Sequence, residues 1–299
     1  MSKVLAKNIE TTDQQVSKLQ DYLMLVKFRL TLMVVVTSVL GYLIAAGWSF
    51  DWTLVSLLFI GGFAVSGAAN GINQVLEKDY DALMDRTKNR PLPADRMKSS
   101  EAVMFSGLLL VFGTICLALI NPLTAFIGMM SFVLYAFLYT PMKRYSTVSV
   151  AIGAIPGALP ALIGVVAHSA TLTTLGITLF LIQFLWQFPH FWAIGYVSFD
   201  DYDKAGYRLL PKSPNGKIDK NLGFYSALYS LLIIPTVLWA YNSGLETSMI
   251  ALLGILLTTI IYTWMAVRLQ MKPSRKTALG LMFSSFFYLP IVLILYLIG

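Results

Sequence analysis

Three polar residues, Asn73, Glu77 and Asp81, recur at every fourth position where a long apolar stretch of the sequence ends. On an α-helix this spacing places all three on one face, because each step of four residues drifts by only about 40°. Like-charged carboxylates on one face repel each other, and a hard divalent cation with oxygen ligands removes that repulsion. Mg²⁺ typically bridges such carboxylates to a substrate phosphate. The pattern therefore predicts metal ligands at Asn73, Glu77 and Asp81.

Basic residues follow within the next nine positions, at Arg86, Lys88 and Arg90. Guanidinium groups match phosphate oxygens in shape and charge, so acids followed by these cations indicate a Mg²⁺–diphosphate site. The alternative is a solvated, salt-bridged helix end that only fixes membrane orientation. Asn70 and Asn73 lie within the apolar run, where polar groups are costly and tend to line cavities, and this favours the diphosphate site.

Two further charged segments could belong to the same site. Lys143 and Arg144 follow a long apolar run and would add to the anion site, although they could also serve only to anchor the helix. A second polar stretch contains three acids within four positions, at Asp200, Asp201 and Asp203. These acids could hold a second Mg²⁺ or simply form an acidic helix end, and their spacing does not single out one of them.

The composition indicates that lipid is the solvent for most of the chain. Of the 299 residues, 57% are hydrophobic and 12% are charged, which is too apolar for a typical soluble domain. A single cysteine, Cys116, excludes an internal disulfide and is expected to pack in the core. Apolar runs of roughly 20 residues are long enough to cross a bilayer as helices. Nine spans are predicted, near residues 28–47, 53–76, 102–121, 123–141, 148–167, 173–197, 222–241, 247–267 and 279–298.

The 22 Lys and Arg residues fix the orientation of these spans. All of them fall in the N-terminal segment or in alternate links, so the positive-inside rule places the N-terminus in the cytoplasm and the C-terminus outside. The net charge of +7 therefore reflects membrane orientation, and no nucleic-acid partner is expected. Residues 1–22 form a polar segment before the first span, and we expect no cleavable signal peptide. Lys27 and Arg29, beside the first span, are among these residues that set the orientation. Both long links, residues 77–101 and 198–220, lie on the cytoplasmic side.

The first polar motif resembles the signature of the UbiA superfamily of intramembrane aromatic prenyltransferases. The likeness runs through Asn73-x3-Glu77-x3-Asp81 and then Met84-x-Arg86-Thr87-x2-Arg90-Pro91. It implies an all-α membrane protein with one domain, residues 1–299, in which nine helices surround a central cavity. It also implies Mg²⁺ as the cofactor and a catalytic role for the first motif.

Two other segments are similar to the heme O synthase branch of that superfamily. They are Trp186-Gln187-Phe188-Pro189-His190-Phe191-Trp192 and Asp201-Tyr202-x2-Ala205-Gly206-x3-Leu210-Pro211. The superfamily commonly has two Asp four residues apart in the second loop, and this sequence does not, so the second metal ligand stays open. Asp201 beside Tyr202 is the preferred candidate.

His190 is the only histidine within a span, and an ionisable residue there indicates function. The alternative is a histidine satisfied by a helix–helix hydrogen bond. The resemblance implies that His190, Trp186, Gln187 and Tyr202 contact heme. His190 would either bind the iron or hydrogen-bond a propionate, and the sequence does not decide between them.

The resemblance implies transfer of a farnesyl group from farnesyl diphosphate to a vinyl group of heme B, with addition of water, to give heme O. A multi-pass protein of a bacterial inner-type cell membrane follows, with its active site facing the cytoplasm. A heme A synthase or oxidase-assembly protein is a possible partner. Three alternatives stay open at this point: a prenyltransferase acting on an aromatic quinone precursor, a transporter of an anionic solute, and a non-catalytic heme chaperone.

Overall fold

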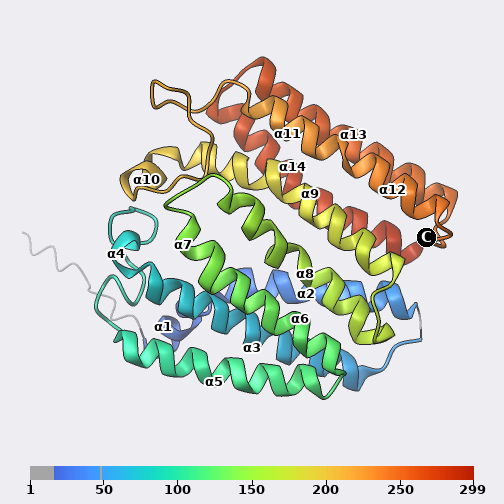
Figure 1. Cartoon of the computed structure of the whole chain (residues 1–299), viewed down its shortest axis with the longest axis horizontal. Helices are drawn as coiled ribbons and strands as arrows, with labels where there is room; N and C mark the ends of the chain where they lie inside the picture. The colour runs from blue at the N-terminus through green and yellow to red at the C-terminus, as the bar shows by residue number, and fades with distance from the viewer. Residues whose placement is uncertain (1–16, 48) are drawn as a thin grey trace, which may run out of the picture.

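The computed structural model describes residues 17–47 and 49–299, and in this part of the chain every regular element is a helix (Figure 1). Lys3, Lys7 and most of the polar N-terminal segment lie outside the described residues. The helices are α1 (Lys18–Leu25), α2 (Phe28–Ala46), α3 (Trp52–Leu76), α4 (Lys78–Asp81), α5 (Ser99–Ala118), α6 (Pro122–Val133), η1 (Leu134–Tyr139), α7 (Thr140–Met142), α8 (Ser149–Ser169), α9 (Thr174–Val197), α10 (Phe199–Lys204), α11 (Leu222–Leu231), α12 (Ile233–Asn242), α13 (Met249–Met271) and α14 (Arg275–Ile298).

Nine helical stretches in the described residues are long and apolar enough to cross a membrane, which confirms the predicted number. Some ends differ from the expected ones by a few residues. The last span begins at Arg275 instead of residue 279, because Ser274 forms a capping box with Thr277 and so starts the helix within polar residues. Asn121 likewise caps α6 and is followed by Pro122, which is favourable in a first helical turn.

The fourth span has an irregular turn that the apolar pattern does not reveal. Residues Leu134–Tyr139 form a π-helical turn between α6 and α7. Pro141 follows it and cannot donate a backbone hydrogen bond, and its ring would clash with a carbonyl one turn earlier in a regular helix. Thr140 Oγ1 donates to the Tyr135 carbonyl at 2.8 Å and so satisfies one of the displaced backbone groups. π-Helical turns are often found at functional sites.

Helix α8 is the most enclosed span, with 72% of its apolar window buried inside the bundle. It packs against α2, α6 and α9. Glycines bring α2 and α8 into backbone contact: a Cβ atom added to Gly164 would lie 1.9 Å from the Ser38 carbonyl oxygen. Larger residues at this crossing would separate the two helices, as small residues commonly permit close approach in membranes.

The two long links lie at one end of the bundle, opposite the C-terminus (Figure 1). The first contains α4 and the second contains α10. They pack on each other through a cluster formed by Met84, Ala205 and Tyr207, with Tyr80 and Tyr202 beside it. This contact agrees with the expectation that both links face the same side of the membrane.

Candidate active site

The residues Asn73, Glu77 and Asp81, here called the polar row, lie on one continuous helical path. Glu77 is the residue between α3 and α4, and backbone hydrogen bonds connect Glu77 N to Asn73 O and Asp81 N to Glu77 O, at 3.0 and 2.8 Å. The Asn73 amide donates to Glu77 Oε2 at 2.8 Å, so adjacent members share a face, as the spacing predicts. All three residues are 5% exposed or less. Two carboxylates that are this deeply buried require ion-pair or hydrogen-bond partners.

Each member of the polar row contacts one cation from a different segment. Lys27 Nζ donates to Asn73 Oδ1 at 2.7 Å, and Lys143 forms an ion pair with Glu77. Arg90 Nη1 lies 2.6 Å from Asp81 Oδ2. Three cations thus face two carboxylates, which leaves the group one positive charge in excess when all are ionised. An excess of positive charge beside oxygen ligands suits an anion that arrives with a divalent metal.

The charge states of Lys27 and Glu77 follow from this crowding. Burial of the ammonium group and the nearby Arg90 guanidinium lower the pKa of Lys27 to about 7, although the Glu77 carboxylate opposes them. Burial alone would raise the pKa of Glu77. The neighbouring Lys143 ammonium, aided by Lys27 and the Tyr207 hydroxyl, more than offsets this, so the pKa of Glu77 is lowered and its carboxyl stays ionised.

The second long link supplies a buried tyrosine to the same place. Tyr207 is 4% exposed, and the ring lies 5.3 Å from Lys143 Nζ. Among the described residues its hydroxyl has no hydrogen-bond partner within standard geometry. Burial, together with the Glu77 and Asp81 carboxylates, raises the pKa of Tyr207, so the hydroxyl keeps its proton. The next residue donates its backbone N–H to the Lys143 carbonyl at 2.7 Å and ties the link to α7.

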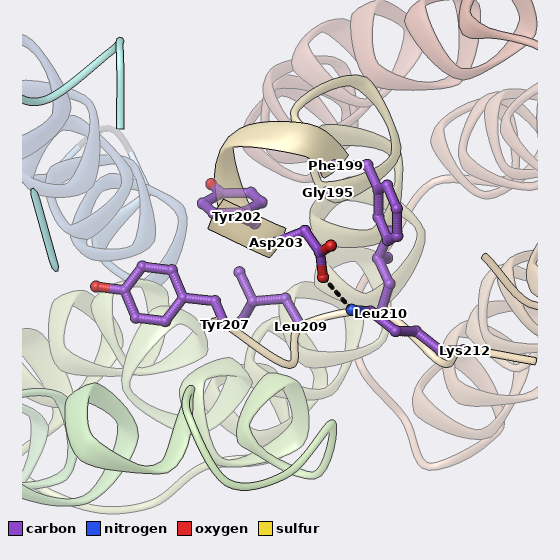
Figure 2. A pocket seen from close by; sticks show the side chains of 8 residues that line it. All are labelled: Gly195, Phe199, Tyr202, Asp203, Tyr207, Leu209, Leu210 and Lys212. Atoms are coloured by element: carbon purple, nitrogen blue, oxygen red, sulfur yellow. Dashed lines mark hydrogen bonds and ion pairs between the residues drawn. The ribbon is translucent and has the colours of Figure 1, made fainter. Parts of the chain in front are cut away.

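The three acidic side chains of the second link, Asp200, Asp201 and Asp203, differ in their contacts and exposure. Asp203 forms an ion pair with Lys212, and Figure 2 shows it turned toward that lysine while the Tyr207 hydroxyl points away from them. Asp200 is exposed. Asp201 is 25% exposed and lies 3.9 Å from Lys204, which also contacts the first link through Asp85 at 3.4 Å. Asp201 is thus the acid on the side where the two links meet.

The remaining predicted cations are not in contact with the polar row. Lys88 pairs with Asp85 at 2.7 Å on the surface. Arg86 donates to the Tyr202 hydroxyl at 3.4 Å, and the Arg144 guanidinium lies over the Tyr80 ring, 4.4 Å from its centroid. The described residues contain no group of three or more His, Cys, Asp or Glu side chains close enough to hold a metal ion. The predicted ligand set Asn73, Glu77, Asp81, Asp200, Asp201 and Asp203 therefore does not form one cluster and stays a prediction.

Sequence reasoning missed Lys27, Thr140 and Tyr207. In the sequence Lys27 indicates only membrane orientation, yet in the structure it reaches Asn73 across 46 positions of the chain. Thr140 is 2% exposed and accepts a hydrogen bond from the Asn73 amide at 3.0 Å. The sequence contains an indication of this contact. Lys27 directly precedes the first span and Asn73 lies near the end of the second, and two successive spans that run in opposite directions bring these positions to the same depth in the membrane.

The side chains of the segment 186–192 in α9 lie on two different faces of the helix. The rings of Trp186 and His190 stack with a centroid distance of 4.6 Å and an interplanar angle of 17°, and both side chains contact Ser285 of α14. Gln187 does not join them, because it is 3% exposed and donates to the Ala154 carbonyl of α8 at 3.1 Å. Its predicted contact with heme stays untested, and its observed role is to link two helices.

The sequence is similar to known proteins over nearly its whole length. The model of the UbiA prenyltransferase family matches residues 34–293. The chain belongs to this family. A protein of Christiangramia forsetii named protoheme IX farnesyltransferase is 40% identical over 294 residues, covering 97% of both chains. A protein of Cytophaga hutchinsonii with the same name is 41% identical over 286 residues, covering 94% of this chain and 98% of the relative.

Solved structures of the family share the fold. One described as digeranylgeranylglyceryl phosphate synthase superposes with a TM-score of 0.78 at 22% identity, covering 94% of this chain and 98% of that chain. A UbiA homolog from Archaeoglobus fulgidus bound to GPP and Mg²⁺ gives a TM-score of 0.68 at 14% identity, covering 92% and 99%. The all-α fold of a multi-pass membrane prenyltransferase is therefore confirmed.

Proposed function

We propose that this chain transfers the farnesyl group of farnesyl diphosphate to a vinyl group of heme B, with addition of water, to give heme O and diphosphate. The observation that carries the proposal is the near-full-length similarity to relatives named protoheme IX farnesyltransferase. The buried polar row and its facing cations support it independently, because they provide what the departure of a diphosphate group requires.

The residues of the polar row fit a magnesium ion by their chemistry. Asn73, Glu77 and Asp81 offer only oxygen donors, which are the ligands that Mg²⁺ prefers, and their helical path places the donors side by side. When bound there, the ion would neutralise charge that develops on the diphosphate oxygens. Asp201 is the acid best placed to support a second ion, because it lies where the two links meet.

Lys27, Lys143 and Arg90 hold the diphosphate in this mechanism. The allylic C–O bond breaks with both electrons passing to the diphosphate oxygen, so negative charge grows on the leaving group. Fixed cations aimed at that charge lower the barrier because they need little reorganisation. The protonated Tyr207 hydroxyl supplies a neutral donor at the same end.

The acceptor half of the reaction takes place in the apolar bundle. The farnesyl cation must be kept from water until the π electrons of the heme vinyl group form the new C–C bond. The cation thus formed beside the porphyrin takes the oxygen of a water molecule and loses a proton to solvent. Trp186 and His190, stacked on each other within α9, are the proposed contacts for the porphyrin.

A conversion assay tests the reaction. Purified protein in lipid is supplied with heme B, farnesyl diphosphate and Mg²⁺, and products are separated and weighed by mass spectrometry. We expect heme O and an equal amount of diphosphate, and we expect a chelator to stop both. Asp81→Asn should lose activity, whereas the matched control Asp95→Asn should keep it, because Asp95 pairs with Lys78 at the surface and its side chain is 82% exposed.

Prenylation of an aromatic quinone precursor with no heme O formed would overturn the choice of acceptor. Release of no diphosphate under any of these conditions would overturn the enzymatic assignment and favour a transporter or a heme chaperone. Equal activity of Asp81→Asn and the wild type would remove the polar row from the mechanism.

We also propose that the active site faces the cytoplasm of a bacterial inner-type membrane. The support is the location of all 22 basic residues in the N-terminal segment and alternate links. In a Cys116→Ser background, an impermeant thiol reagent added to intact spheroplasts should label Ser243→Cys and leave Asn215→Cys unlabelled. Inside-out vesicles should give the reverse result, and labelling of Asn215→Cys from outside would contradict the orientation.

A further inference from the structure

The imidazole of His190 is held from two sides at the contact between α9 and α14. His190 Nδ1 lies 2.7 Å from the Oγ atom of Ser285, which is fully buried. The Trp186 ring covers one face of the imidazole, and its Nε1–H donates to the Ser285 carbonyl at 3.0 Å. The Trp186 carbonyl in turn accepts from the Tyr262 hydroxyl of α13 at 3.0 Å. Rotation of the imidazole would break its hydrogen bond and its stacking together.

The hydrogen bonds of Ser285 favour one of the two neutral tautomers of His190. A serine hydroxyl has one proton to donate. The Met282 carbonyl, 2.5 Å from Ser285 Oγ, can only accept, whereas the contact with Nδ1 can run in either direction depending on the tautomer. Both contacts are therefore satisfied together only when Nδ1 carries the hydrogen. In a neutral imidazole with the proton on Nδ1, the Nε2 atom has a free lone pair.

In the Nδ1–H tautomer, His190 can contact a porphyrin in only one of the two ways considered above. A neutral Nε2 without hydrogen cannot donate to a propionate carboxylate, but it can bind iron. Among the described residues, His190 makes its side-chain hydrogen bond to Ser285 and none to a carboxylate, so no acidic partner favours a charged imidazolium. The ring is only partly buried, which leaves part of it accessible from outside the contact.

We propose that Ser285 is a positioning residue that holds His190 in the Nδ1–H form, so that Nε2 can coordinate the iron of the heme substrate. The proposal rests on the proposed function and names the mode of heme contact within it. In metal-binding histidines generally, the hydrogen bond made by one ring nitrogen fixes the orientation and basicity of the other. Removing such a partner typically lowers metal affinity by about 10–100-fold.

Heme binding without turnover tests this role. The purified full chain in lipid is titrated with ferrous heme B in the absence of farnesyl diphosphate, and the iron–imidazole vibration is recorded by resonance Raman spectroscopy. We expect this band in the wild type, its loss in His190→Ala, and its return when free imidazole is added to that variant. Ser285→Ala should bind heme about 10-fold more weakly and shift the band to lower frequency, because the Nδ1–H bond to an acceptor is lost.

Two control variants separate positioning from general damage to the helix. Ser285→Thr keeps a hydroxyl and should retain the wild-type band. Ser284→Ala removes the neighbouring hydroxyl, which donates to the Leu281 carbonyl at 2.8 Å and does not contact His190, and it should change nothing. Should Ser285→Ala fail to fold, the frequency in Ser285→Thr and the imidazole rescue of His190→Ala still decide the question.

The outcomes separate this inference from the proposed function. An iron–imidazole band that persists in His190→Ala, or one that does not move in Ser285→Ala, would overturn the inference while heme O formation continues to support the enzyme. Absence of heme binding in the wild type, together with absence of heme O in the conversion assay, would instead overturn the proposed acceptor.

Discussion

Replacing Lys27 by methionine removes one of the three cations that face the polar row and keeps a side chain of similar length. Lys27 adopts a left-handed backbone conformation (φ 49°) directly before α2 and contacts Asn73 Oδ1 at 2.7 Å. The substitution leaves two cations facing two carboxylates, so the excess positive charge is lost. Loss of one donor to a developing anion typically costs about 2.7–4 kcal/mol, which corresponds to about 10²–10³-fold in kcat.

Part of the effect of Lys27→Met falls on stability. Asn73 is 1% exposed, and leaving a buried acceptor unsatisfied costs about 1–3 kcal/mol. The two effects are separated by measuring kcat and KM for farnesyl diphosphate and, in parallel, thermal unfolding in detergent. We expect at least a 100-fold decrease in kcat/KM with a modestly lower melting temperature.

Arg29→Gln is the matched control, because Arg29 lies two residues further along and is exposed. It removes one positive charge from the same segment and should leave kcat/KM within about twofold of the wild type. A folded Lys27→Met enzyme with nearly wild-type kcat/KM would refute the assignment of Lys27 to the diphosphate site. Equal losses in Lys27→Met and Arg29→Gln would show that general surface charge, and not the contact with Asn73, is responsible.

Two further predictions concern the second link and the helix core. Tyr207→Phe keeps the ring over Lys143 but removes the buried hydroxyl. We expect kcat to fall about 10-fold, as the loss of one hydrogen bond of about 1.4 kcal/mol predicts, with unchanged thermal stability; an unchanged kcat would exclude the hydroxyl from the reaction. Gly164→Val should lower the melting temperature strongly, because overpacking against Ser38 costs about 1–3 kcal/mol or more. Gly280→Val is its control, since apart from the adjacent residues and backbone of its own helix nothing lies within 4 Å of an added Cβ. Equal destabilisation by both would show that loss of glycine itself is the cause.

The fold was largely predictable because lipid imposes a simple pattern on the sequence. Each span must satisfy its own backbone, so apolar length alone locates the helices, and the basic residues between them check the number. Local exceptions were not visible in this pattern. The π-helical turn Leu134–Tyr139 depends on Pro141 and on a hydroxyl that bonds back to Tyr135, and hydropathy reports neither.

The candidate site was predictable where its residues follow one another along a helix. Asn73, Glu77 and Asp81 were identified because a period of four is visible in one segment. The partners of these residues were harder to predict. The sequence indicates that Lys143 could contribute to an anion site, but its ion pair with Glu77 joins residues far apart in the chain. The contact between His190 and Ser285 spans 95 positions, and nothing near Ser285 in the sequence marks it.

Because the residues of the site come from distant parts of the chain, they become available in a fixed order during synthesis. Chains emerge from the ribosome N-terminus first, at roughly 5–20 residues per second. Asn73 can meet Lys27 once the second span has been inserted, because both residues have then been made. Glu77 must wait for Lys143 after the fourth span, and Tyr207 arrives only after the sixth. A ribosome that stalls before Lys143 therefore leaves Glu77 in the membrane without its ion-pair partner, and only a chain extended past Tyr207 has all of these groups.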